Sequence, residues 1–325
     1  MEGINRFDFK GSACRLSGVQ LGLSDGPDMI LIHGMRDHAL SLLPIAREFC
    51  SHYRITMPDL RGHGHSDNSG SYTMMQFVSD LRALIEQRQL QKPIIMGHSL
   101  GGHVASRYAS IYSEEVSALV LIDGMGPPVL PVEDSPGTEG LNLEKLSGDE
   151  LIKKTRQAHE RDHIASLLAL SSALRPMVNA EEALSRLMKN NPLLSADAAR
   201  IIVDEGIEPH PDGGVRWRWD PAVGMVWSTF SHDENEAQWK WIDCPVLIAT
   251  GDRALDYWSQ MRPHLAGRQD LQDSEIERRR RLFKKAVSRI IQNAGHMIHY
   301  DQPELLNRIL REFLYETDNS SSSCD

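Results

Sequence analysis

The chain has 325 residues, of which 41% are hydrophobic and 25% charged, the composition of an ordinary globular protein. Its length exceeds the ~250–300 residues at which a single core stops growing, so we expect one large domain with an inserted piece. The net charge of −10 argues against a nucleic-acid partner, which would require a basic surface. The first residues lack an apolar secretory segment, and no stretch approaches the ~18 apolar residues that span a bilayer. We therefore expect a cytoplasmic protein with no membrane span.

Short apolar runs that alternate with amphipathic segments dominate the first 123 residues. Four of these runs predict buried strands, at 29–32, 53–57, 93–96 and 118–122. Between the second and third runs, residues 75–89 carry apolar side chains at helical spacing. This alternation predicts an α/β fold with a mostly parallel sheet that helices cover on both faces.

The alternation stops after Asp123. Residues 131–140 have a loop-like composition, and helical patterns without strands follow over 143–208. Strand patterns return at 245–250 and 287–291. The insertion interrupts the α/β pattern, and this indicates a core built from two separate stretches of sequence.

We therefore divide the chain into a core, an insert and a tail. The core comprises 1–126 and 239–317, the mainly helical cap comprises 127–238, and the serine-rich tail, expected to be disordered, comprises 318–325.

The strongest chemical signal is Gly97-His98-Ser99-Leu100-Gly101, which follows a predicted strand and precedes a predicted helix. A serine on such a sharp turn is lifted above the sheet, and only small residues fit beside it. The N–H group of Leu100 then lies at a helix N-terminus, where an oxyanion is stabilised. Ser99 is the candidate nucleophile.

A histidine follows the last predicted strand, in Asn293-Ala294-Gly295-His296. From the end of a late strand, His296 can reach Ser99, take its proton and return it to a leaving group. Most of the 14 histidines are better interpreted as surface or packing residues, among them His63, His65 and His299. None of these three has the same position at a strand end.

The chain resembles the α/β-hydrolase superfamily, in the branch with a helical cap inserted after the sixth strand. The resemblance rests on five segments in the family's order: ILIHGM, MPDLRGHGHS, IIMGHSLGGH, LVLIDG and NAGHMIHYDQPE. It implies the order serine, acid, histidine, and it makes Met35 the donor of a second oxyanion N–H group. Ser99 stands where the related haloalkane dehalogenases and epoxide hydrolases carry aspartate, which argues against those two activities.

The sequence departs from the family pattern at the acid. The usual position lies three residues beyond a glycine after the seventh strand; here the glycine is Gly251 and that position is Ala254. Some relatives carry the acid at the end of the sixth strand, and Asp123 has that place. We favour Asp123, with Asp252 and then Asp256 as alternatives, since geometry must decide the acid of a triad.

Five residues are expected to line a substrate pocket: His33, Gly34, His98, Met225 and Trp227. Other aromatic residues of the insert, such as Trp217, Trp219 and Phe230, are expected to form the cap's own core. The basic run 278–281 is interpreted as a solvated helix face.

The predicted function is cleavage of a small-molecule ester or thioester through an acyl-enzyme, without cofactor or metal. The four cysteines (Cys14, Cys50, Cys244 and Cys324) lack the spacing of a zinc site or a disulfide framework. The alternatives are a C–C hydrolase or lyase on the same scaffold, or a ligand-binding receptor that resembles a hydrolase. The sequence leaves the physiological substrate and the oligomeric state open.

Overall fold

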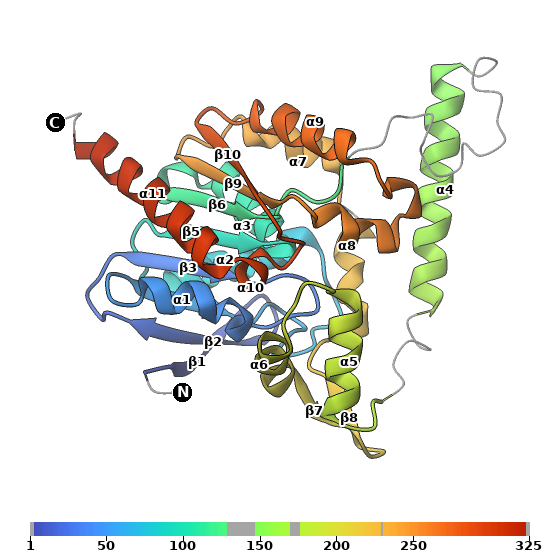
Figure 1. Ribbon diagram of the computed structural model, residues 1–325, viewed down its shortest axis with the longest axis horizontal. Helices are drawn as coiled ribbons and strands as arrows, with labels where there is room; N and C mark the ends of the chain where they lie inside the picture. Colours follow the sequence, from blue (N-terminus) through green and yellow to red (C-terminus); the bar gives the residue numbers. More distant parts are fainter. Residues whose placement is uncertain (1–2, 129–146, 170–175, 229, 323–325) are drawn as a thin grey trace.

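An eight-stranded sheet forms the centre of the protein in the computed structural model, which describes residues 3–128, 147–169, 176–228 and 230–322 (Figure 1). The strands lie in the order β1-β2-β4-β3-β5-β6-β9-β10, and all pairs from β4 onward are parallel. Their bounds are β1 Asn5–Lys10, β2 Arg15–Gly22, β3 Asp28–Ile32, β4 Arg54–Pro58, β5 Ile94–His98, β6 Ala118–Ile122, β9 Val246–Gly251 and β10 Ala286–Ile291. The predicted α/β fold with a mostly parallel sheet is confirmed.

Helices cover both faces of this sheet (Figure 1). Because successive strand residues point to opposite faces, Ile30 and Ile32 of β3 join one apolar cluster, whereas Met29 and Leu31 join the other. The helices of the described residues are α1 Leu43–Phe49, α2 Met74–Gln87, α3 Leu100–Ile111, α4 Gly148–Ala169, α5 Ala180–Asn190, α6 Ala196–Gly206, α7 His232–Trp239, α8 Ala254–Met261, α9 Gln269–Arg280, α10 Ile298–Asp301 and α11 Pro303–Ser322. Short 3₁₀ helices add η1 Ala39–Leu42, η2 Ser113–Glu115, η6 Pro221–Ser228 and η7 Pro263–Leu265. Among the described residues, no helix is long and apolar enough to cross a membrane.

The edge strand β1 and its neighbour β2 escaped the sequence analysis. They pair antiparallel to each other, and β2 pairs antiparallel to β4. Most residues of β1 are exposed, because the strand lies at the edge of the sheet and packs on one face only. An edge strand of this kind lacks the continuous apolar run by which the central strands were recognised.

The insert between β6 and α7 contains α4, α5, α6 and a hairpin of β7 (Ile207–Pro209) and β8 (Val215–Trp217) that was not predicted. Helix α4 stands at the outside of the molecule (Figure 1). The end of the insert is tied to the core: Tyr72 donates its hydroxyl proton to Asp220 at 2.6 Å, and the N–H of Asp220 donates to the carbonyl of Gly62 at 2.8 Å. The expected loop at 131–140 lies outside the described residues.

Two expected boundaries fall inside helices. The division at 238/239 lies within α7, which packs on the core helix α3 and buries Trp239 in the core. Helix α11 continues to Ser322 and so includes part of the tail 318–325 for which disorder is expected; 323–325 lie outside the described residues. A helix extends into polar residues because each further N–H group bonds to a carbonyl four residues earlier, whatever its side chain.

A buried ion pair fixes the loop after β4. The guanidinium of Arg61 lies 2.6 Å from the carboxylate of Asp80 on α2, with both side chains almost fully buried. Arg61 also donates to the carbonyls of Ser12 and Ser71. The pair therefore joins the N-terminal strands, α2 and the loop that meets the insert.

We predict that Asp80→Asn lowers the free energy of unfolding by about 3–5 kcal/mol, because it leaves a buried guanidinium without its counter-charge. Urea unfolding followed by circular dichroism measures this loss. Asp8→Asn is the control, since the pair of Asp8 with Arg15 is exposed and such pairs contribute about 0–1 kcal/mol. Equal losses in the two variants would contradict the prediction.

Candidate active site

The turn between β5 and α3 has no room for larger side chains. A Cβ on Gly97 would lie 2.2 Å from the carbonyl oxygen of Gly101, and a Cβ on Gly101 would lie 2.2 Å from that of Ile32. Ser99, between these glycines, has φ 51° and ψ −118°, a conformation that costs energy for a residue with a side chain. Such strain is held only where the surrounding structure enforces it, and here the packed glycines do so.

The same close packing continues into the strand next to β5. A Cβ on Gly102 would lie 2.5 Å from the Cα of Gly124, so α3 lies directly against the loop that follows β6. Leu100 is the first residue of α3, and the first N–H groups of a helix have no partner within it. The structure thus places the N-terminus of α3 directly after Ser99. The end of β6 lies against this first turn of α3.

Asp123 and His296 form a short, buried contact. His296 Nδ1 lies 2.5 Å from Asp123 Oδ2, and the exposed fractions of the two side chains are 5% and 8%. An ionised carboxylate only accepts hydrogen bonds, so Nδ1 carries the proton and the lone pair of the neutral ring is on Nε2. Asp123 itself has φ 42°, and its N–H donates to the carbonyl of Ala249 at 2.7 Å.

The imidazole of His296 is enclosed by other rings. Tyr257 stacks on it with 4.1 Å between ring centroids and 8° between planes, and Trp258 meets it edge-on at 5.2 Å. The ring of His98 lies at 4.7 Å, and its Nε2 is 2.9 Å from the carbonyl oxygen of His296. Tyr257 and Trp258 were missed by the sequence analysis; their signal is two adjacent aromatic residues shortly after the strand that ends at Gly251.

His98, the residue before Ser99, bonds directly to the loop that carries His296. In the described part of the chain, Ser99 Oγ and His296 share no hydrogen bond. Such bonds are often long in a free enzyme and shorten when substrate binds.

The competing carboxylates bond elsewhere. Asp252 Oδ1 accepts the N–H of Ala294 at 3.1 Å, which fixes the loop that carries His296. Asp256 pairs with Arg253 at 2.9 Å, and both of these side chains are exposed. Of the three candidate acids, only Asp123 is brought against the His296 ring.

His33 has a different place from the one expected. It is fully buried, Nδ1 is 2.7 Å from the carbonyl of Gly34, and Nε2 accepts the N–H of Leu60 at 3.0 Å. Burial lowers its pKa to about 3, so the ring is neutral. Both ring nitrogens are used by the backbone, and His33 therefore holds the loop of Met35 instead of facing a substrate.

Gly34 lets the loop after β3 lie against the turn between β5 and α3 that carries Ser99. A Cβ at this position would lie 2.9 Å from His98 Nδ1 and 3.1 Å from Ser99 Cβ. Met35 follows directly, and its half-buried side chain packs on the same apolar cluster as Leu100. The loop expected to donate the second oxyanion N–H group therefore lies beside Ser99.

The insert meets the core through η6. Its Val223 and Val226 are fully buried, and its half-buried Met225 and Trp227 pack on the same cluster. Trp227 contacts the ring of His103 edge-on at 5.4 Å; His103 lies one turn beyond Ser99 on α3. Met225 and Trp227 are thus packed against the core, with part of each side chain exposed.

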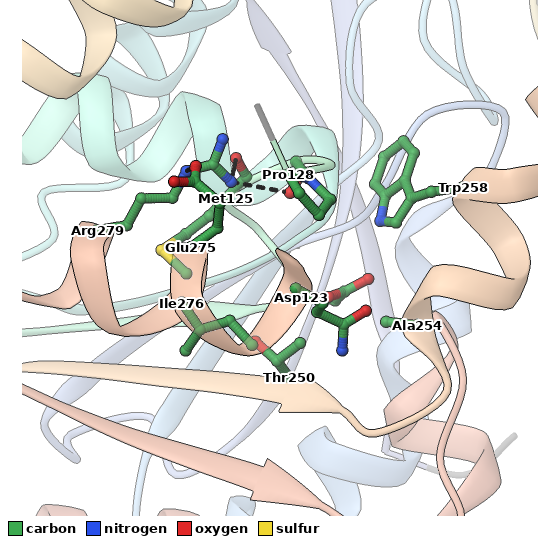
Figure 2. Close-up of a pocket in the computed structure, with 11 residues that line it drawn as sticks. Asp123, Met125, Pro128, Thr250, Ala254, Trp258, Glu275, Ile276 and Arg279 are labelled. Carbon is green, nitrogen blue, oxygen red and sulfur yellow. Dashed lines mark hydrogen bonds and ion pairs between the residues drawn. The ribbon is translucent and has the colours of Figure 1, made fainter. Parts of the chain in front are cut away.

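A cavity of about 20 Å³ lies behind Asp123, between the loop after β6, α8 and α9 (Figure 2). Arg279 reaches into its wall from α9, and its side chain is only 2% exposed. The interpretation of 278–281 as a solvated helix face is therefore wrong for Arg279, because α9 turns this one residue of the run inward. A second cavity of about 20 Å³ adjoins His296 and Tyr257. Each has room for about one water molecule.

Nothing in the described segments assembles a metal site from three or more His, Cys, Asp or Glu side chains. Cys14, Cys50 and Cys244 are free thiols.

Comparison with known proteins places this geometry in a family. Residues 29–309 match the pattern described as "Alpha/beta hydrolase family". A putative esterase/lipase of Haemophilus influenzae is 24% identical over 89% of this chain and 83% of its own, and a serine hydrolase-like protein of Danio rerio is 24% identical over 92% and 85%. The crystal structure of E-2-(acetamidomethylene)succinate hydrolase superposes with a TM-score of 0.72 at 19% identity, over 96% of this chain and 99% of that one. These relatives support a hydrolase activity, and the chain belongs to the alpha/beta hydrolase family.

Proposed function

We propose that the protein is a serine hydrolase that cleaves small-molecule esters or thioesters through an acyl-enzyme. One observation carries this proposal: a serine sits on a strained turn at a helix N-terminus, and the residue before it, His98, packs on a histidine whose Nδ1 is 2.5 Å from a buried carboxylate. That is the arrangement of nucleophile, base and acid that acyl transfer requires. Relatives described as a putative esterase/lipase and a serine hydrolase-like protein agree with it.

Acylation begins when Ser99 Oγ attacks the substrate carbonyl carbon. His296 Nε2 takes the hydroxyl proton, and the carbonyl electron pair moves to oxygen. The N–H groups of Leu100 and Met35 donate to this oxyanion. When the tetrahedral intermediate collapses, the bond to the leaving oxygen or sulfur breaks, and His296 gives its proton to that atom.

Deacylation repeats the same steps with water. His296 Nε2 takes a proton from water, the oxygen attacks the acyl carbon, and the acid product leaves as Ser99 regains its proton. Asp123 keeps the imidazole in the required orientation and stabilises the imidazolium that forms twice in each cycle. No step needs a metal or a cofactor.

We predict that Ser99 is the one serine labelled by a fluorophosphonate probe. Ser99→Ala should abolish the labelling seen by mass spectrometry and lower kcat on p-nitrophenyl acetate by ~10⁶, the usual effect of losing this nucleophile. Ser110→Ala, on the same helix, should change neither, because the Ser110 hydroxyl donates to a helix carbonyl at 2.8 Å.

Labelling that survives in Ser99→Ala would refute the nucleophile assignment. A burst of p-nitrophenol at stoichiometric enzyme separates the enzyme from its rivals. Ligand binding without a burst would favour a hydrolase-like receptor. Turnover of C–C substrates alone would favour the C–C hydrolase or lyase.

A second prediction concerns the acid. Asp123→Asn should lower kcat by up to ~10⁴, because the amide cannot stabilise the imidazolium or hold the required tautomer. Asp252→Asn is the matched control: its side chain bonds to the backbone N–H of Ala294, and we expect no more than a few-fold change. Steady-state kinetics on both variants, with circular dichroism to verify folding, compares them. A reversed order of the two losses would transfer the role to Asp252.

A third prediction concerns the insert, which contributes no residue to the proposed triad. Met225→Ala and Trp227→Ala should change the relative kcat/KM among acetyl, butyryl and octanoyl esters more than the rate of probe labelling. The reason is that both side chains pack on the cluster containing Leu100 while staying partly exposed. Ile201→Ala, an exposed site on α6, serves as control. A uniform loss on all esters and on the probe would argue against a role in selectivity.

A further inference from the structure

Arg279 donates hydrogen bonds to the loop that follows Asp123. Its Nη1 donates to the carbonyl oxygens of Met125 at 3.2 Å and Gly126 at 3.1 Å, and its Nη2 donates to that of Pro127 at 3.0 Å. Three consecutive carbonyls are thus bound by one guanidinium that is almost completely buried. Figure 2 shows the Arg279 side chain extending from α9 toward this loop, with Asp123 below the loop in this view.

Two carboxylates hold the guanidinium in place. Glu236 on α7 accepts from Arg279 Nε at 3.0 Å, and Glu275, one turn earlier on α9, lies 3.4 Å from the same nitrogen. Arg278 pairs with the same two glutamates, so the four charges balance. A buried cation is stable only when it is paired and hydrogen-bonded, and these partners meet that requirement.

The backbone of Asp123 is fixed on its other side by the sheet. Its N–H donates to Ala249 on β9, and Gly124 packs against Gly102 with a spacing that admits no side chain. Beyond Gly124, the hydrogen bonds from Arg279 to the next three carbonyls hold the backbone that follows Asp123. Arg279 therefore binds the backbone directly after the point where Asp123 leaves β6 with a positive φ.

We propose that Arg279 is a positioning residue for the catalytic acid: through the carbonyls of residues 125–127 it fixes the backbone that aims the Asp123 carboxylate at His296 Nδ1. The inference rests on the proposed function, since it assigns Asp123 as the acid. Arginine is required because its planar fork presents several N–H donors in fixed directions, whereas the compact ammonium of lysine cannot reproduce that geometry.

The central experiment is a double-mutant cycle. Arg279→Lys keeps the positive charge and should lower kcat on p-nitrophenyl acetate about 10²-fold with little change in KM, the scale of effect that a displacement of ~1 Å causes at a catalytic group. In an Asp123→Asn background the same substitution should cost no more than about two-fold, because the acid it positions is already lost. Losses that multiply in the double variant would overturn the proposal.

Arg278→Lys is the matched control, because Arg278 shares both glutamates and touches none of the three carbonyls. It should leave kcat unchanged. A loss equal to that of Arg279→Lys would assign the effect to the ion-pair network as a whole and overturn the positioning role.

A spectroscopic measurement tests the same point without activity. A proton in a short His–Asp hydrogen bond gives a far-downfield ¹H signal, which His296 should show in the wild-type chain and in Arg278→Lys. Arg279→Lys should shift or broaden it beyond detection. If Arg279→Lys does not fold, Glu236→Gln removes one support of Arg279 and should weaken the signal and kcat together. An unchanged signal in a folded variant would refute the proposal.

The same set of measurements separates the two proposals. A wild-type chain that neither reacts with the fluorophosphonate nor shows a burst refutes the proposed function. A reactive wild type whose kcat and downfield signal survive Arg279→Lys refutes only the role of Arg279.

Discussion

The candidate site depends on a region where backbones meet without side chains between them. Gly97, Gly101, Gly102 and Gly124 each occupy a place where a Cβ would lie less than 3 Å from neighbouring atoms. This packing forces the sharp turn at Ser99, sets the start of α3 at the turn, and holds the end of β6 against the helix. These three features cannot vary separately, because a side chain at any of the four positions would push apart the elements that carry the candidate nucleophile, oxyanion donor and acid.

Buried histidines surround the site, and their partners distinguish their roles. His33 and His63 bond to backbone groups, and burial lowers the pKa to about 3 and about 4, respectively, because desolvation disfavours the charged ring. The neutral ring of His33 joins two backbone segments, because Nδ1 bonds to the carbonyl of Gly34 and Nε2 accepts the N–H of Leu60. Among these described histidines, His296 has a carboxylate against its ring, with 2.5 Å between Nδ1 and Asp123 Oδ2, and this partner distinguishes it as the proposed base.

Much of this was accessible from the sequence, because strand ends in a parallel sheet fall at one edge. The register pairs His98 with Ile122 and Ile122 with Ala249, so the residues just after these strands must be neighbours. Apolar runs and glycines revealed the strand ends. Asp123 and Asp252 could not be separated this way, since both follow such ends; the choice depends on the backbone angles of single residues, and Asp123 has φ 42°.

Arg279 was inaccessible for a related reason. In the run 278–281, four identical side chains on about one helical turn must include inward and outward positions, and the phase depends on how α9 packs. The inward residue, Arg279, pairs with Glu236 of α7, which lies 43 positions earlier in the chain. A charge pattern along one helix holds no information about such a partner. The antiparallel strands β1 and β2 were missed similarly, because their burial depends on neighbouring strands and not on their own composition.

The position of Asp123 on β6 has a consequence for the end of β9. Gly251 approaches the His296 loop so closely that a Cβ would lie 2.3 Å from the carbonyl of Ala294, and Asp252 then binds the N–H of that same residue. The end of β9 thus holds the loop and leaves the carboxylate at His296 to β6. The first turns of α8 do not supply the carboxylate at His296. They place Tyr257 flat against the imidazole and Trp258 at its edge. Support for the proposed base is divided accordingly: the residue after β6 supplies the carboxylate at Nδ1, and α8 supplies the aromatic rings that pack on the imidazole.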